Sequence, residues 1–349
     1  MTIDTEWKRQ YNALKKFITS NPEINIHTDG VAIPENLRDK FYNQFDDVRR
    51  SIVKAWSSSF DFDVYTLGKN YIEAENKLAE TLNLKHMELP VDLASFLHSP
   101  GEGMTRHIYN RLFELLQGKI TENDFERMVE GDLNSNVTEF FRLGYEQWAA
   151  VSILLLLEPD EILGVSLDDD YNLCISGLDQ ITFGKQYHHP AKRIPEFIIH
   201  SKKLDRYIAF KMPLTTEVAF YSLPVEIPTQ RLLRDRTGDT SSVLGYRMVF
   251  LSFVQDIKKF PIFADMHERT INGPDLAIEF LMEHDLSDPE AIRQVQNRME
   301  IIKPRLGGNI VLMDPESISG SFDKKDNLDV FSVGLGPSGL QPIIDKLAN

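Results

Sequence analysis

The sequence predicts an α+β fold, with an irregular all-α helical domain at residues 1–158 and an α+β domain with a mixed sheet at residues 159–349. Three observations predict it. The length of 349 residues suits two domains. Apolar residues recur every three or four positions before Glu158. After Glu158 the apolar runs are short, rich in β-branched and aromatic residues, and separated by turn-forming residues. The change of period therefore places the expected domain boundary near Glu158.

The first half of the chain has the period of amphipathic helices. Pro34 opens the strongest of them, in which an aromatic and aliphatic stripe advances by three or four residues. Gly118 is placed to end a helix, and Thr121 with Asp124 resembles a capping box that starts the next one. No fixed repeat period is present, which favours an irregular bundle over a solenoid. The expected helices cover residues 7–18, 34–56, 67–82, 108–116, 121–129 and 141–155.

The second half of the chain predicts strands first and helices later. Two apolar runs, 197–199 and 207–210, are joined by a polar turn and predict a hairpin. Pro274 and Pro289 each predict the start of a helix. Residues 243–254 fit a helix or a strand. The other expected strands are 162–167, 173–175, 218–223, 261–264, 309–313 and 328–333, and a last helix is expected at 341–347.

Composition and charge exclude several classes of protein. Hydrophobic residues at 42% and charged residues at 26% are globular values. A formal charge of −15 opposes binding to phosphate backbones and anionic lipid, so direct nucleic-acid binding is not expected. Cys174 is the single cysteine, which excludes an intramolecular disulfide and multi-cysteine metal sites; in a predicted strand it is expected to be a small buried hydrophobe.

The chain carries no visible targeting signal. The N-terminus lacks the apolar stretch of a signal peptide. The most apolar run, Trp148–Leu157, is far shorter than the roughly 20 residues that cross a bilayer, and it is expected to be a buried helix end. The expected protein is therefore cytoplasmic and makes no contact with a membrane.

A glycine-rich loop follows the strand expected at 328–333. Its sequence, Gly-Leu-Gly-Pro-Ser-Gly-Leu from Gly334, resembles the glycine fingerprint of FAD-dependent oxidoreductases, where small residues let a helix N-terminus approach a pyrophosphate. That fingerprint opens a βαβ unit, yet only ten residues follow Gly339. The loop therefore either joins a strand to the last helix or binds a phosphate or carboxylate through the amides of Gly334, Gly336 and Gly339.

A second candidate site begins at Asp265. Asp265 and His267 alternate along an extended backbone, where a carboxylate and an imidazole can share a divalent metal or a proton. Asp314, after the strand expected at 309–313, is the third candidate ligand if both strands run the same way. The competing interpretation is a capped turn with solvated side chains. The catalytic candidates are Asp265, His267 and Glu268, and the metal candidates are Asp265, His267 and Asp314; a divalent metal is the one cofactor that the sequence suggests.

A cluster of arginines stands out in this acidic chain. Arg231, Arg234 and Arg236 carry planar guanidinium groups, which match carboxylates and phosphates in a two-pronged geometry. They are candidate anion-binding residues. The competing interpretation is that they pair with surface acids or with the acidic face of a partner subunit.

Two classes of function fit these observations. The first is a protein-interaction or assembly component, in which the helical half presents a groove or face to a protein partner or to a second copy. The absence of the common catalytic motifs favours it. The alternative is a hydrolase or transferase that acts on an anionic small molecule or phosphoester through Asp265, His267 and Glu268. We favour the first hypothesis.

Overall fold

The computed structural model divides the chain into two compact units. It describes residues 5–27, 30–57, 63–106, 108–168, 173–183, 195–211, 248–257, 264–265, 270–271, 274–282, 285, 287–313 and 328–348. One unit, here called the helical unit, comprises residues 1–69 and 91–144, and the other, the sheet unit, comprises 70–90 and 145–349. Units that are compact in their internal contacts do not have to fold independently. The domain boundary at Glu158 therefore stays a prediction.

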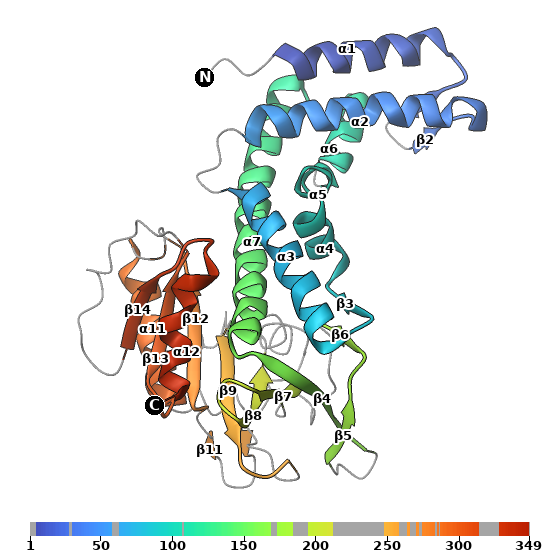
Figure 1. The fold of residues 1–349 in the computed structure, drawn as a ribbon. Helices are drawn as coiled ribbons and strands as arrows, with labels where there is room; N and C mark the ends of the chain where they lie inside the picture. Colours follow the sequence, from blue (N-terminus) through green and yellow to red (C-terminus); the bar gives the residue numbers. More distant parts are fainter. Residues whose placement is uncertain are drawn as a thin grey trace. The chain divides into compact units, whose positions relative to one another are not determined.

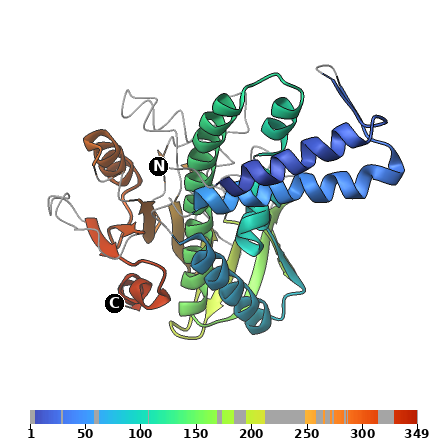
Figure 2. The ribbon, with the colours of Figure 1, turned by 90° about the horizontal axis from the view of Figure 1, so that it is seen from above.

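The helical unit is built from amphipathic helices whose apolar faces meet. Helices α1 and α2 lie side by side (Figures 1 and 2). Arg49 of α2 donates from Nε to the carbonyl oxygen of Thr105 at 3.1 Å. The helices are α1 (Thr5–Ser20), α2 (Glu35–Ser57), α4 (Val91–His98), α5 (Pro100–Arg106), α6 (Tyr109–Leu116), and the first parts of α3 (Val64–Leu82) and α7 (Glu122–Leu156).

Aromatic side chains fill the interior between α2 and α6. Phe45 is fully buried, and its ring centroid lies 4.5 Å from that of Phe113 and 5.3 Å from that of Tyr109. Phe41 stacks on Phe45 at 5.8 Å. Phe41 and Phe45 belong to the apolar stripe expected at residues 34–56, and the structure places this stripe on α2, facing the aromatic side chains of α6.

The sheet unit is organised around an eight-stranded mixed sheet. Its strand order is β14-β13-β12-β9-β8-β7-β4-β5, in which β12, β13 and β14 are parallel and the other pairs are antiparallel. The strands are β4 (Pro159–Leu167), β5 (Leu173–Gly177), β7 (Phe197–Ser201), β8 (Arg206–Lys211), β9 (Met248–Val254), β12 (Leu276–Leu281), β13 (Gly308–Leu312) and β14 (Leu328–Ser332).

Helices cover both faces of the parallel end of this sheet. On one face, Val295 of α11 (Pro289–Ile302) packs against Ile310 and its neighbours. On the other, Lys346 of α12 (Gln341–Ala348) donates from Nζ to Asn309 Oδ1 at 2.5 Å. Figure 2 shows α11 and α12 on opposite sides of the strands. The α+β fold with a helical first part and a mixed sheet is thus confirmed.

Among the described residues, three further ladders are short. Strand β1 (Asn25–His27) pairs with β2 (Gly30–Ala32), β3 (His86–Glu88) with β6 (Gln180–Thr182), and β10 (Ala264–Asp265) with β11 (Thr270–Ile271). Strands β1, β2 and β3 precede Glu158 and are not among the elements expected above. A short 3₁₀ helix, η4 (Pro337–Leu340), leads into α12.

Several expected elements differ from the structure. The two helices expected at 121–129 and 141–155 are one helix, α7, and the helix expected from Pro274 is strand β12. Residues 243–254 contain strand β9. Cys174 is exposed, because β5 is an edge strand of the sheet. The strand expected at 218–223 lies outside the described residues.

In the described part of the chain, no helix is both long enough and apolar enough to cross a bilayer.

Candidate functional site

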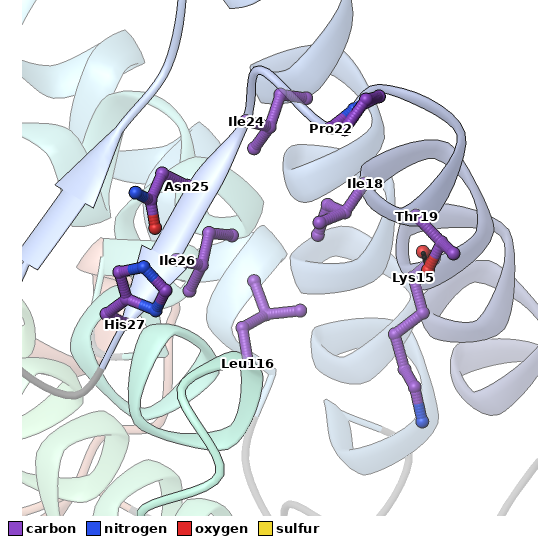
Figure 3. Close-up of a pocket in the computed structure, with 9 residues that line it drawn as sticks. All are labelled: Lys15, Ile18, Thr19, Pro22, Ile24, Asn25, Ile26, His27 and Leu116. Carbon is purple, nitrogen blue, oxygen red and sulfur yellow. Dashed lines mark hydrogen bonds between the residues drawn. The ribbon is translucent and has the colours of Figure 1, made fainter.

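A pocket of about 430 Å³ opens on the helical unit (Figure 3). Its volume falls in the range of pockets that bind small molecules or peptide side chains. Aliphatic side chains form its floor, and Ile18, Ile26 and Leu116 point toward one another there (Figure 3). The lining consists of Lys15, Ile18, Thr19, Pro22, Ile24, Asn25, Ile26, His27 and Leu116.

The turn after α1 brings these residues together. Asn21 donates from Nδ2 to the carbonyl oxygen of Phe17 at 2.7 Å and so satisfies a carbonyl in the last turn of the helix. The amide of Ile24 donates to the carbonyl oxygen of Asn21 at 2.9 Å. This turn directs the chain into β1, which lies along the pocket with Ile26 on its floor.

The end of α6 supplies Leu116 to the floor of the pocket. Gly118 has a φ of +67°, the left-handed conformation that the sequence predicts for it, and its amide donates to the carbonyl oxygen of Leu115 at 3.1 Å. The helix therefore ends close to Leu116, and the half-buried Leu116 side chain remains at the pocket.

Polar groups surround the aliphatic floor. Asn25 and His27 lie on one side of it and Lys15 on another (Figure 3). The Lys15 ammonium is 5.1 Å from the centroid of the Tyr11 ring, a cation–π contact. Thr19 donates from Oγ1 to the carbonyl oxygen of Lys15 at 2.9 Å. The arrangement is an apolar depression with a cation and hydrogen-bonding groups at its rim.

The glycine-rich loop is occupied by contacts within the sheet unit. The hydroxyl of Tyr145 donates to the carbonyl oxygen of Gly334 at 2.6 Å, and Asn70 Nδ2 donates to that of Leu335 at 2.8 Å. Gly334 has a φ of +61°, and a Cβ on Gly339 would lie 3.0 Å from Val333 Cα. These contacts explain glycine at both positions without a ligand. Anion binding by Gly334, Gly336 and Gly339 stays a prediction.

Of the other predicted site residues, the structure describes Asp265 alone. Asp265 lies in β10 opposite Thr270, in a ladder separate from the eight-stranded sheet. His267, Glu268, Asp314 and the three arginines, Arg231, Arg234 and Arg236, lie outside the described residues. The acid/base, metal and anion hypotheses therefore stay predictions. Among the residues that the structure describes, no group of three or more His, Cys, Asp and Glu could hold a metal ion.

A histidine and a carboxylate meet at the end of the β7–β8 hairpin. His200 Nδ1 lies 2.7 Å from Asp160 Oδ1, and this hydrogen bond lowers the pKa of Asp160. His200 Nε2 faces Asp205 Oδ1 at 3.8 Å. Tyr207, whose ring packs 4.9 Å from the imidazole, donates to Glu161 Oε2 at 2.7 Å. In a Ser-His-Asp triad a hydroxyl lies at the second nitrogen of the histidine, whereas here a carboxylate faces it.

Two buried charges lie on one face of the sheet, on either side of β9. Lys211 is opposite Phe250, and Glu279 is opposite Met248. Both pairs share a face, because side chains two residues apart point the same way. Lys211 and Glu279 are 4% and 2% exposed. Both residues have an interaction partner, which a charge needs if it is to be buried stably.

No protein-family model, curated protein or solved structure matches this chain.

The sequence analysis missed the pocket, although one signal of it was present. Residues 24–32 read Ile-Asn-Ile-His-Thr-Asp-Gly-Val-Ala, in which Asp-Gly is typical of hairpin turns and short apolar runs flank it. That signal predicts the β1–β2 hairpin. It does not predict that Leu116, far along the chain, completes the floor.

Proposed function

We propose that this chain is a protein-interaction or assembly component, and that its helical unit binds a partner through the pocket at Ile26. One observation carries the proposal: an aliphatic floor lies open between α1, β1 and α6, with polar groups around it. Interfaces place apolar anchor side chains in such depressions and polar contacts at the rim.

The proposal concerns a protein partner in a reducing compartment, and we place it in the cytoplasm. A chain with a single cysteine suits that environment. Nucleic acid is not the proposed partner, since a charge of −15 opposes binding to phosphates.

Selection from a phage-displayed library of random decapeptides tests the proposal. The immobilised full-length chain is compared with the variants Ile26→Ser and Val31→Ser. Val31 is the cross-strand neighbour of Ile26, is 39% exposed and does not line the pocket. It is therefore a matched control for loss of an aliphatic side chain from the same hairpin.

The expected result is a set of peptides that bind the wild-type chain and Val31→Ser but not Ile26→Ser. Circular dichroism and thermal unfolding check that Ile26→Ser remains folded. Failure to enrich any peptide, or enrichment of the same peptides by Ile26→Ser, would overturn the proposal.

A further inference from the structure

Helix α1 carries a net positive charge, although the chain as a whole is acidic. The helix carries Lys8, Arg9, Lys15 and Lys16 against a single acid, Glu6. In its first half the cations are paired: Lys8 with Glu126 at 2.9 Å and Arg9 with Glu6 at 2.6 Å.

The two cations in the second half of α1 have no acidic partner within the described residues. Among the residues that the structure describes, the Lys15 ammonium contacts the face of Tyr11. Both lysines are exposed, but only Lys15 lines the pocket. An aliphatic floor beside a lysine that has no ion-pair partner among the described residues matches a ligand that is apolar at one point and anionic beside it.

We infer that the occupant of the pocket is a peptide segment of a separate partner protein, with an aliphatic anchor side chain next to an acidic residue. This inference rests on the proposed function. The anchor packs on Ile18, Ile26 and Leu116, and the carboxylate meets Lys15 outside the floor, where Figure 3 places its side chain. Asn25 and His27 offer hydrogen-bonding groups to the peptide on another side.

The chain's overall negative charge does not prevent an acidic peptide segment from binding at the pocket. Charges farther away than the Debye length of about 8 Å at physiological salt are largely screened, whereas Lys15 lies at the rim itself. The same screening predicts that added salt weakens the preference for acidic peptides.

The decapeptide selection, repeated on Lys15→Glu and Lys16→Glu, tests the inference. These adjacent exposed lysines lie on the same helix, so the two variants change the net charge equally and differ in their place relative to the pocket. Peptides selected by the wild-type chain and by Lys16→Glu are expected to carry Asp or Glu beside an aliphatic residue. Peptides selected by Lys15→Glu are expected to carry Lys or Arg there.

A direct affinity measurement gives the magnitude. One selected peptide and its Asp/Glu-to-Asn/Gln version are titrated by fluorescence anisotropy. The acidic peptide is expected to lose about three- to tenfold in affinity with Lys15→Glu, and less with Lys16→Glu.

Three outcomes would overturn the inference. Equal effects of Lys15→Glu and Lys16→Glu would assign the preference to general charge. Peptides that need Ile26 but show no acidic preference would overturn the inference and leave the proposed function standing. Concentration-dependent self-association of the full chain that Ile26→Ser and Lys15→Glu both remove would identify a second copy as the occupant; the exposed Val91, next to Asp92, would then be the first anchor to substitute.

Discussion

The helical unit and the sheet unit differ in the distance along the sequence over which their contacts form. In the helical unit, α1 packs on the next helix, α2, and each turn repeats the same apolar stripe. In the sheet unit, the Asn70–Leu335 hydrogen bond spans 265 residues and the Tyr145–Gly334 bond spans 189. A periodic sequence therefore reveals the first unit, whereas the second depends on pairings that no local period encodes.

The largest expected loss of stability comes from removing one buried ring from the interior of each unit. Phe45→Ala removes a fully buried ring from the helical unit, and Phe210→Ala removes one from the sheet unit, where it stacks on Phe197 at 5.4 Å. Each is expected to cost about 3–5 kcal/mol because a cavity remains. Urea unfolding followed by circular dichroism measures the loss.

The comparison predicts two transitions, one for each unit. Phe45→Ala is expected to shift one of them and Phe210→Ala the other. If both variants shift a single common transition by the same amount, the two units unfold as one cooperative body. The expectation of a separate transition for each unit would then be wrong.

The next effect tests a long-range contact of the sheet unit. Tyr145→Phe removes the donor to Gly334 and leaves a carbonyl without that bond, at an expected cost of about 1–3 kcal/mol. Burial raises the pKa of Tyr145, so its hydroxyl stays protonated and donates at neutral pH. Chemical unfolding measures the cost, with Tyr65→Phe as the control because Tyr65 is 58% exposed. Equal stability of the two variants would contradict the role given to this contact.

A smaller loss of stability is expected at a helix cap of the sheet unit, where a local sequence signal also determines the structure. Asp288 caps α11, where its side chain accepts a hydrogen bond from the amide of Glu290 at 2.9 Å. Asp288→Ala is expected to cost about 1 kcal/mol, and Asp288→Asn should retain most of the stability, since asparagine caps about as well. Thermal unfolding of both variants measures the difference. An Asn variant as unstable as the Ala variant would argue against capping.

The smallest effect is a pH dependence at the edge of the sheet unit. The hydrogen bond from His200 lowers the pKa of Asp160 below its ordinary value of 3.8. The resulting stability is present above that value and is lost as the pH falls through the lower folded-state pKa. In Asp160→Asn this loss on acidification should be smaller. The urea midpoint of the wild-type chain and of Asp160→Asn is measured at about pH 6 and at about pH 3. An equal fall of the midpoint in both proteins would refute the assignment.

The sequence predicts the fold class and most helices, and its errors have physical causes. Residues 276–281 were expected to be helical because Pro274 precedes an apolar run. All six residues of β12 are buried, since helices cover both faces of the sheet there. A strand buried on both faces shows no alternation, so its period cannot distinguish it from a helix.

A second error concerns α7, which the sequence divides in two. The gap between the two expected helices, residues 130–140, contains Gly131, a residue that disfavours a helix interior. Leu133 and Val137 are each 1% exposed and continue the buried stripe through this gap at a step of four residues. The helix is therefore continuous because its apolar face is buried throughout, which outweighs the low local helix propensity.

The candidate site was less predictable than the fold. The motifs singled out in the sequence were clusters of one residue type within a few positions, such as the arginine cluster and the glycine-rich loop. The pocket consists of ordinary isoleucines and a leucine that meet only in three dimensions. A site of this kind has no spacing rule that a sequence can display.

The exposed Cys174 has a practical consequence for all of these experiments. As the only thiol in the chain, it accepts one maleimide dye at a defined place on β5 without any engineered cysteine. A fluorophore there would follow the unfolding of the sheet unit separately from that of the helical unit. The edge strand thus offers a built-in reporter with which the two transitions can be told apart.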